Sequence, residues 1–153
     1  MTEDILISVK GLHALNDAED EQEQEIEIFS AGKYYFKNGK HYILYEEQSE
    51  EDGSIIKNRI TLKNDCLEVQ KKGLIDSKMI FEQDKKNTSW YNTPFGNLLA
   101  GTTVTDMSVK EADDLIDIHV KYELEVNYER VADCCIQIKV MAKDSGLFHI
   151  TES

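Results

Sequence analysis

Four residues of this chain, Tyr45, Glu47, Asn58 and Lys71, combine polar chemistry with a predicted place inside the fold. A partly desolvated carboxylate beside a phenol and an amine can exchange protons with a small substrate, or it can hold a ligand. A charged group that is buried without a partner is costly. We therefore expect Glu47 and Lys71 to meet each other, to reach a ligand or to escape to water at the rim.

The inward position of Glu47 follows from the hairpin predicted around the Asn-Gly turn at 38–39, the strongest two-residue turn signal in the chain. In that register Tyr34 opposes Ile43, which is an apolar pair typical of a core. Side chains alternate between the two faces of a strand, so Tyr45 and Glu47 inherit the same inner face.

A second hairpin, with an Asn-Asp turn at 64–65, places Asn58 opposite Lys71. The same face carries two apolar pairs, Leu62 with Leu67 and Ile60 with Val69. We therefore expect Glu47, Asn58 and Lys71 to form a polar patch near one end of the interior. The alternative is that Glu47 and Lys71 are rim residues whose charged ends reach water, because a bulge near a strand end shifts the alternation.

The segment TSWYNTPFG, residues 88–96, contains the only tryptophan and the only proline of the chain. Pro94 cannot donate a backbone hydrogen bond and presets its own φ, so the residues from Thr93 onward suit a type I turn. Two interpretations stay open, namely a hairpin turn with aromatic cross-strand packing and the lip of a ligand site. Tyr91 and Thr93 share the face expected to point inward, and Trp90 is expected outside.

The other reactive residues form no recognisable site. The histidines, at 13, 41, 119 and 149, lack the spacing of metal ligands. The three cysteines contain no CxxC pair, and the adjacent Cys134 and Cys135 should point to opposite faces of a strand, so we expect reduced thiols. No nucleophile–base pair or phosphate-binding loop is present. We predict no metal, no cofactor and no catalytic residue.

The elements that must position these side chains are β-strands. Residues 116–126, IDIHVKYELEV, alternate apolar and polar side chains throughout, and residues 135–143 repeat the pattern. The acidic segment 16–25 lacks an apolar stripe and is predicted to be a loop, and residues 144–153 form a tail. Turn signals divide the core, residues 4–143, into ten strands at about 4–11, 24–37, 40–48, 54–63, 66–71, 77–83, 87–93, 97–108, 114–127 and 132–143.

Long strands that each have one apolar face need either a second sheet or closure. The chain shows no alternation of strands with helices, no internal repeat and no linker, so residues 1–153 are expected to form a single domain. An up-and-down barrel removes exposed strand edges. We therefore predict an all-β fold, a single antiparallel up-and-down β-barrel of eight to ten strands.

The composition excludes some partners. Thirty acidic against seventeen basic residues give a formal net charge of −13, which argues against binding to nucleic acid or to an anionic membrane. No window approaches the roughly eighteen apolar residues of a membrane helix. The first residues alternate instead of forming a signal peptide, so a cytoplasmic location is expected. The sequence carries no signal for the oligomeric state.

Four segments resemble the YwiB-like family of small bacterial proteins: GKYYFKNGKHYILYEE, KKG at 71–73, KMIFE at 78–82 and TSWYNTPFG. The resemblance covers about residues 5–141. Its most specific pattern, T-x-x-Y-x-T-P-x-G, is matched by Thr88, Tyr91, Thr93, Pro94 and Gly96. It implies a calycin-like, lipocalin-like barrel and no established activity or cofactor. The family usually has arginine where this chain has Lys71, so a bidentate anion contact is not carried over.

Three functions stay open. We favour binding of a small amphipathic molecule inside the barrel, because such barrels have room for one ligand and ligand pockets combine apolar walls with a few polar groups. The candidate ligand-binding residues are Tyr34, Tyr45, Glu47, Asn58, Lys71, Phe81, Tyr91 and Thr93. The alternative is a plugged barrel that acts as a structural or protein-interaction module and meets partners through the acidic loop at 16–25 or through Trp90. An enzyme that uses Glu47 with Lys71 and Tyr45 is the least supported, since no further catalytic apparatus accompanies them.

Overall fold

The computed structural model describes residues 3–11, 27–48, 53–64, 66–94 and 96–143. Among them, no helix has the length and hydropathy needed to span a membrane. Ten strands are formed by these described residues: β1 (Asp4–Lys10), β2 (Glu27–Lys37), β3 (Lys40–Gln48), β4 (Ile55–Lys63), β5 (Cys66–Lys72), β6 (Asp76–Glu82), β7 (Lys86–Thr93), β8 (Gly96–Ala112), β9 (Leu115–Val126) and β10 (Glu129–Ala142).

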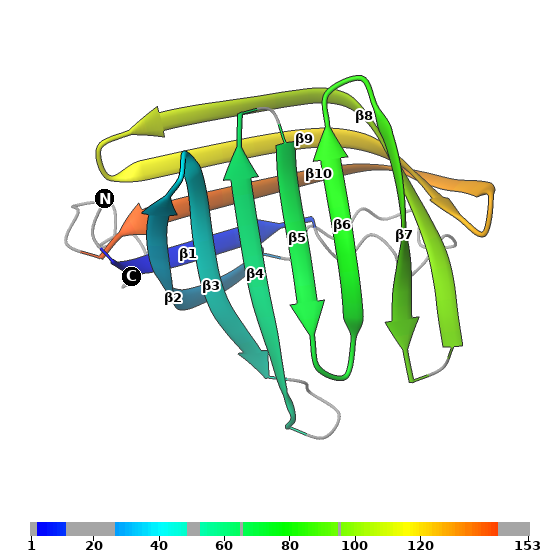
Figure 1. Ribbon diagram of the computed structural model, residues 1–153, viewed down its shortest axis with the longest axis horizontal. Coiled ribbons are helices and arrows are strands. Elements are labelled where there is room, and N and C mark those ends of the chain that lie inside the picture. The colour runs from blue at the N-terminus through cyan, green and yellow to red at the C-terminus, as the bar shows by residue number, and fades with distance from the viewer. Residues whose placement is uncertain (1–2, 12–26, 49–52, 65, 95, 144–153) are drawn as a thin grey trace.

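The ten strands close into one antiparallel barrel (Figure 1). Each strand pairs with the next along the chain, and β1 pairs with both β2 and β10. In Figure 1, β3–β7 stand upright in front while β1, β9 and β10 cross behind them. The long strand β8 starts beside β7 and bends to run beside β9, and it carries a bulge between Val104 and Asp106. The predicted up-and-down barrel is confirmed.

The interior is a continuous apolar core. Ile43, Ile60 and Leu67 are completely buried, and Phe81 packs edge-on against Tyr122 with ring centroids 4.9 Å apart. Fully burying a side chain of this size contributes about 1.5–3 kcal/mol. Buried and exposed residues alternate along β4, β9 and most of β10. Burial of the apolar side chains on the inner face is therefore the main contribution to the stability of the barrel.

Both hairpins used to orient the candidate residues have the predicted register. Asn38 and Gly39 have φ values of 54° and 76°, as a two-residue type I′ turn requires, and Gly32 lies opposite Tyr45. In the second hairpin Asn58 lies opposite Lys71. The sequence pattern therefore placed these side chains on the correct face of their strands.

One local expectation is wrong. The same alternation puts Phe36 inside, but its side chain is mostly exposed at the strand end and packs on the ring of His41, with centroids 4.9 Å apart. The segment KEADDL, residues 110–115, which is predicted to hold at most one helical turn, has none: β8 continues to Ala112, and a tight turn leads into β9. The acidic loop at 16–25 and the tail at 144–153 lie outside the described residues.

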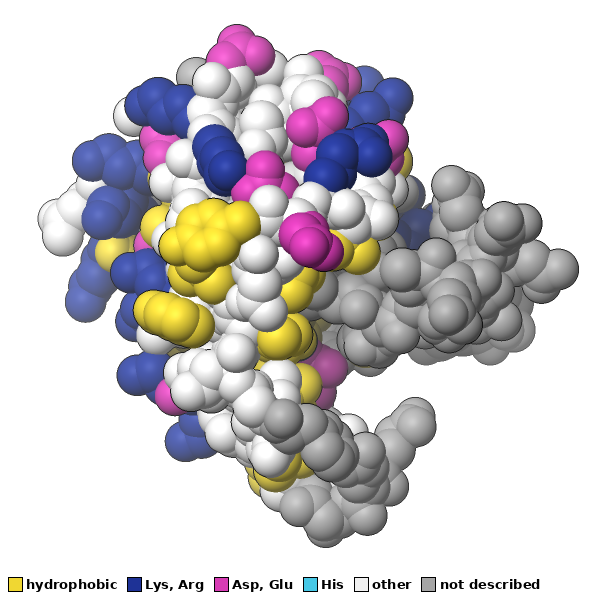
Figure 2. All heavy atoms as spheres, turned by 90° about the vertical axis from the view of Figure 1, so that its right-hand side faces the viewer, with side chains coloured by type: hydrophobic (Ala, Val, Ile, Leu, Met, Phe, Trp, Pro, Cys, Tyr) yellow, Lys and Arg dark blue, Asp and Glu magenta, His cyan; other side chains and the backbone are white. Residues whose placement is uncertain are grey.

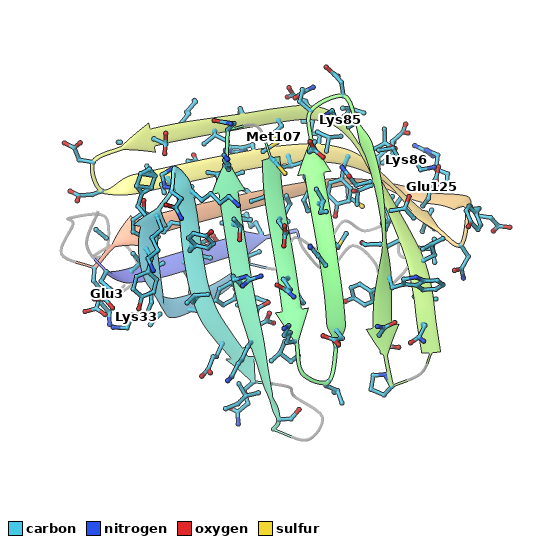
Figure 3. All side chains as sticks on the ribbon, in the orientation of Figure 1. Glu3, Lys33, Lys85, Lys86, Met107 and Glu125 are labelled. Carbon is cyan, nitrogen blue, oxygen red and sulfur yellow. The ribbon has the colours of Figure 1, made fainter. Side chains whose placement is uncertain are left out.

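The side of the barrel formed by β7 and β8 exposes apolar surface. Figure 2 shows hydrophobic side chains on this face, flanked by charged ones. Trp90 points outward as predicted and is 60% exposed, and it lies opposite Leu99 of β8. On the same side Lys86 forms a 2.6 Å ion pair with Glu125, which ties β7 to β9 across the intervening strand (Figure 3).

The ladder between β6 and β7 is the weakest seam of the barrel. These strands share only two pairs in the described residues, Asp76 with Asn92 and Ser77 with Tyr91, while the β8–β9 ladder runs the length of both strands. Beyond those pairs the buried hydroxyl of Thr102, from β8, donates to the carbonyl oxygen of Ile80 at 2.8 Å. One side chain therefore replaces part of a missing backbone ladder.

Substitution Thr102→Val is expected to destabilise the protein by about 1–3 kcal/mol, because the Ile80 carbonyl loses its partner in a buried place while the side-chain shape is kept. The free energy of unfolding from urea titration measures this. Thr105→Val is the matched control: its hydroxyl donates to the Lys121 carbonyl at an exposed site, and we expect a change below about 0.5 kcal/mol. Equal effects of the two substitutions would contradict the role of Thr102.

Candidate functional site

A row of inward-facing residues crosses the front of the barrel at one level. Each member lies directly opposite the next in the strand registers, and all but the first carry a polar group. We call this row the polar belt: Gly32, Tyr45, Asn58, Lys71, Ser77 and Tyr91. In β5, β6 and β7 it lies within three residues of the strand end, at the lower rim in Figure 1, so it borders one mouth of the barrel.

Glu47 and Lys71 are paired inside this mouth. The Nζ atom of Lys71 donates to Oε1 of Glu47 at 2.5 Å, and the two side chains are only 9% and 17% exposed. The alternative of two solvated rim residues is therefore wrong. A short, charge-assisted hydrogen bond of this kind offsets the cost of removing both charges from water.

Asn58 has the least satisfied side chain of the belt. It is 2% exposed, and its Nδ2 atom donates a long bond of 3.4 Å to the carbonyl oxygen of Ile56. Its Oδ1 atom is buried and has no hydrogen-bond partner among the described residues. An orphaned acceptor costs about 1–3 kcal/mol, and native interiors contain few of them.

The negative charge of Glu47 acts on two phenols of the belt, those of Tyr45 and Tyr91. Burial raises the pKa of Tyr45 above its ordinary value of 10.0, and the negative charge of Glu47 raises it further. The same two causes, in the same order, raise the pKa of Tyr91. Both groups are therefore neutral hydroxyls that can donate or accept hydrogen bonds at the mouth.

The other three predicted residues lie elsewhere. Phe81 belongs to the apolar core, and the hydroxyl of Thr93 donates to the Gly96 carbonyl at 2.9 Å within the turn. Tyr34 lies farther along β2, where its hydroxyl contacts Nδ1 of His41 at 2.7 Å. The structure thus brings together Tyr45, Glu47, Asn58, Lys71 and Tyr91, and separates Tyr34, Phe81 and Thr93 from them.

Sequence reasoning missed a second polar cluster. Nε2 of His41 lies 2.7 Å from the carboxylate of Glu111, so a phenol, an imidazole and a carboxylate form a chain that links the β2–β3 hairpin to β8. Glu111 is far from His41 in sequence, and no pattern joins the two. Ser77 of the belt could have been found, because it lies opposite Lys71 in the next hairpin.

The remaining sequence predictions concern metal ligands and cysteines. Within the residues that the structure describes, no group of three His, Cys, Asp or Glu side chains converges to hold a metal ion. Cys134 is buried and Cys135 exposed, on opposite faces of β10 as predicted.

The comparisons identify a fold and a family. The family model described as "Domain of unknown function (DUF1934)" matches residues 7–138. The crystal structure of the YwiB protein from Bacillus subtilis is similar to this chain, with a TM-score of 0.75, 20% identity and coverage of 92% of each chain. No curated protein matches. The similarity to a solved structure at this identity concerns the fold alone.

The contribution of the ion pair can be measured by breaking it from one side. Lys71→Met is expected to lower the free energy of unfolding by about 1–3 kcal/mol, because the largely buried carboxylate of Glu47 loses the ammonium group that donates to it. The double substitution Glu47→Leu with Lys71→Met should recover most of this loss. As a control, Lys78→Met removes an exposed 3.6 Å pair with Glu68 and should cost less than about 0.5 kcal/mol.

The buried phenols make stability fall at high pH. A tyrosine whose folded pKa lies above 10.0 keeps its proton in the folded protein but loses it in the unfolded chain, so the contribution is complete below pH 10 and is lost as the pH rises further. Urea titrations on both sides of pH 10 should show this decline, and Tyr91→Phe should make it shallower. A decline of the same slope in Tyr91→Phe would contradict the burial of that phenol.

Proposed function

The chain belongs to the DUF1934 family, and we propose that it binds a small amphipathic molecule at the inner mouth of its barrel. The observation that supports this most directly is the orphaned Oδ1 atom of Asn58, which is buried and lies opposite the charged Lys71 in the polar belt. A ligand that donates an N–H or O–H group to this atom would remove the free-energy cost of leaving a buried acceptor without a hydrogen bond.

The neighbours of Asn58 define the polar end of the ligand. An ammonium group has three N–H donors, and Lys71 uses one on Glu47, so two remain for a carbonyl or carboxylate of the ligand. The hydroxyls of Tyr45 and Tyr91 add donors and acceptors at the same level. The ligand should therefore carry both a donor and an acceptor, with an apolar part that packs against the core.

The weak β6–β7 seam gives this site a route for access. Tyr91 is partly buried, and its backbone forms one of only two described pairs between those strands. Opening that short ladder breaks few backbone hydrogen bonds, so this side of the mouth opens at lower cost than the long ladders on either side of β9.

A plugged barrel that meets a protein partner is the second candidate. The complete burial of core residues such as Phe81 favours a filled interior. The outward Trp90 is an aromatic side chain of the kind that anchors protein interfaces. Ligand binding and this function differ in where the functional residues lie, on the inner or the outer face.

Native mass spectrometry of the protein purified gently from its own host tests the proposal. We expect a retained small molecule on the wild type, and its loss from Asn58→Leu, which removes the acceptor and keeps the side chain large. Because this substitution also removes an unsatisfied polar atom, Asn58→Leu should unfold at the same urea concentration as the wild type or at a higher one.

The matched control is Asn92→Leu, on the outer face of β7, which should keep the molecule. Tyr91→Phe, which removes a hydroxyl without changing the packing, provides a second variant if Asn58→Leu does not fold. A wild-type protein of bare polypeptide mass, together with a well-folded Asn58→Leu, would overturn the proposal in favour of the plugged barrel.

A further inference from the structure

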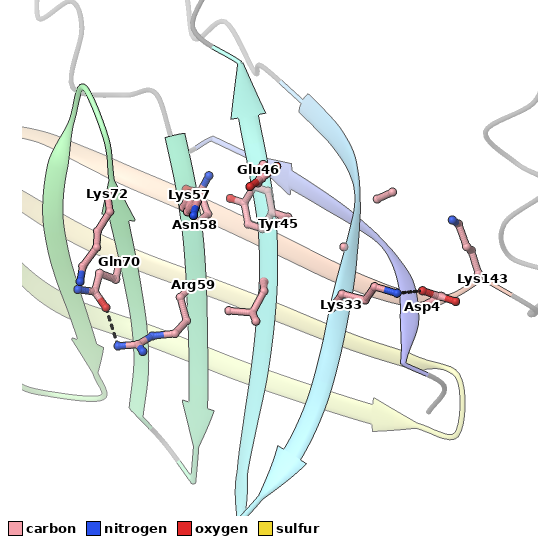
Figure 4. A pocket seen from close by; sticks show the side chains of 13 residues that line it. Asp4, Lys33, Tyr45, Glu46, Lys57, Asn58, Arg59, Gln70, Lys72 and Lys143 are labelled. Atoms are coloured by element: carbon pink, nitrogen blue, oxygen red, sulfur yellow. Dashed lines mark hydrogen bonds and ion pairs between the residues drawn. The ribbon is translucent and has the colours of Figure 1, made fainter. Parts of the chain in front are cut away.

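The outer face of the front strands carries a groove that is separate from the inner mouth. Its volume is about 810 Å³, within the range of small-molecule sites, and it lies over β2–β5 and reaches the ends of β1 and β10 (Figure 4). The side chain of Leu44, which is 37% exposed, forms an apolar part of the groove surface. Tyr45 and Asn58 also border the groove, although alternation along the strands directs their side chains to the other face of the sheet.

The groove has the opposite sign of charge to the protein as a whole. In a chain of net charge −13 it is lined by five basic and two acidic residues: Lys33, Lys57, Arg59, Lys72 and Lys143, against Asp4 and Glu46. Asp4 is already paired with Lys33. Arg59 donates at 2.6 Å to the neutral amide of Gln70. No ion pair within 4 Å joins Lys57, Arg59 or Lys72 to an acidic side chain of the described residues.

Two of these cations face each other directly. Lys57 of β4 lies opposite Lys72 of β5 on one side and opposite Glu46 of β3 on the other, and all three side chains are on the exposed face. Like charges at directly opposed positions destabilise a sheet. Arg59 adds a third charge two residues along the same face, and its bond to Gln70 holds the guanidinium toward β5, where Lys72 extends (Figure 4). An anion between these groups would turn the repulsion into attraction.

We propose that this groove binds a small multivalent anion of the phosphate type, with Lys57, Arg59 and Lys72 as its cationic contacts. A guanidinium held in place suits the paired oxygens of a phosphate, and the two ammonium groups supply compact charges. Because the groove is open to solvent, binding weakens as the salt concentration rises. The site lies on the opposite face of the sheet from Asn58, so it is independent of the ligand proposed for the barrel interior.

Isothermal titration with inorganic pyrophosphate tests this site on the full chain, at an ionic strength of about 0.15 M. We expect saturable binding of one pyrophosphate per chain. The double substitution Lys57→Gln with Lys72→Gln should weaken it by at least about tenfold, since two charge-assisted contacts are lost. Pyrophosphate should also raise the melting temperature of the wild type and not that of the double variant.

The matched control is Lys37→Gln with Lys40→Gln, which removes the same charge from another directly opposed lysine pair outside the groove. This control should change the affinity less than about twofold if the contacts are local, because charges farther than a Debye length are screened. Absence of saturable binding, or equal weakening by the two double substitutions, would overturn the proposal. Without pyrophosphate, the melting temperature of the groove variant should not fall below that of the wild type, because the substitution relieves repulsion.

Discussion

Closure of the sheet through the β1–β10 ladder is the constraint on which the rest of this structure depends. The six pairs from Ile5–Ala142 to Lys10–Gln137 join the first and last strands, so every strand has a neighbour on each side. A closed sheet has only an inner and an outer face, and each residue must occupy one of them. The apolar side chains fill the inside. A polar residue that alternation along its strand places on the inner face has to be accommodated there as well.

The polar belt shows how that requirement is met. Glu47 and Lys71 satisfy each other, and the two phenols of Tyr45 and Tyr91 stay neutral because burial disfavours their ionised forms. Asn58 is the exception, since its Oδ1 atom is left without a partner. Asn58 lies in this belt near one mouth of the barrel, where we propose that a ligand supplies the missing donor.

On part of the outer face, the local charge is opposite in sign to the net charge of the chain. The chain carries an excess of acidic residues, yet basic side chains gather over β4 and β5, where Lys57 and Lys72 oppose each other. Solvent lowers the cost of this repulsion but does not remove it. The two faces of the same strands thus present two distinct chemistries: a buried polar cluster inside and a groove with an excess of basic side chains outside.

Much of this arrangement could be predicted from the sequence, because alternation and turn chemistry are local. The Asn-Gly turn at 38–39 determined the register of its hairpin, and that register placed Tyr45 and Glu47 on the inner face. Cross-strand parity did the same for Asn58 and Lys71. The ten strands and their closure followed from edges that have to be paired.

Tertiary structure alone decided what these side chains meet. Whether Glu47 and Lys71 pair or reach solvent depends on how far the barrel mouth shields them, and that is set by strands distant in sequence. The contact of His41 with Glu111 and the sparse β6–β7 ladder that Thr102 spans depend on the same long-range packing. Local sequence determines which face a residue occupies, whereas its partners, its burial and its charge environment arise only when the sheet closes, because those energies depend on distances between strands.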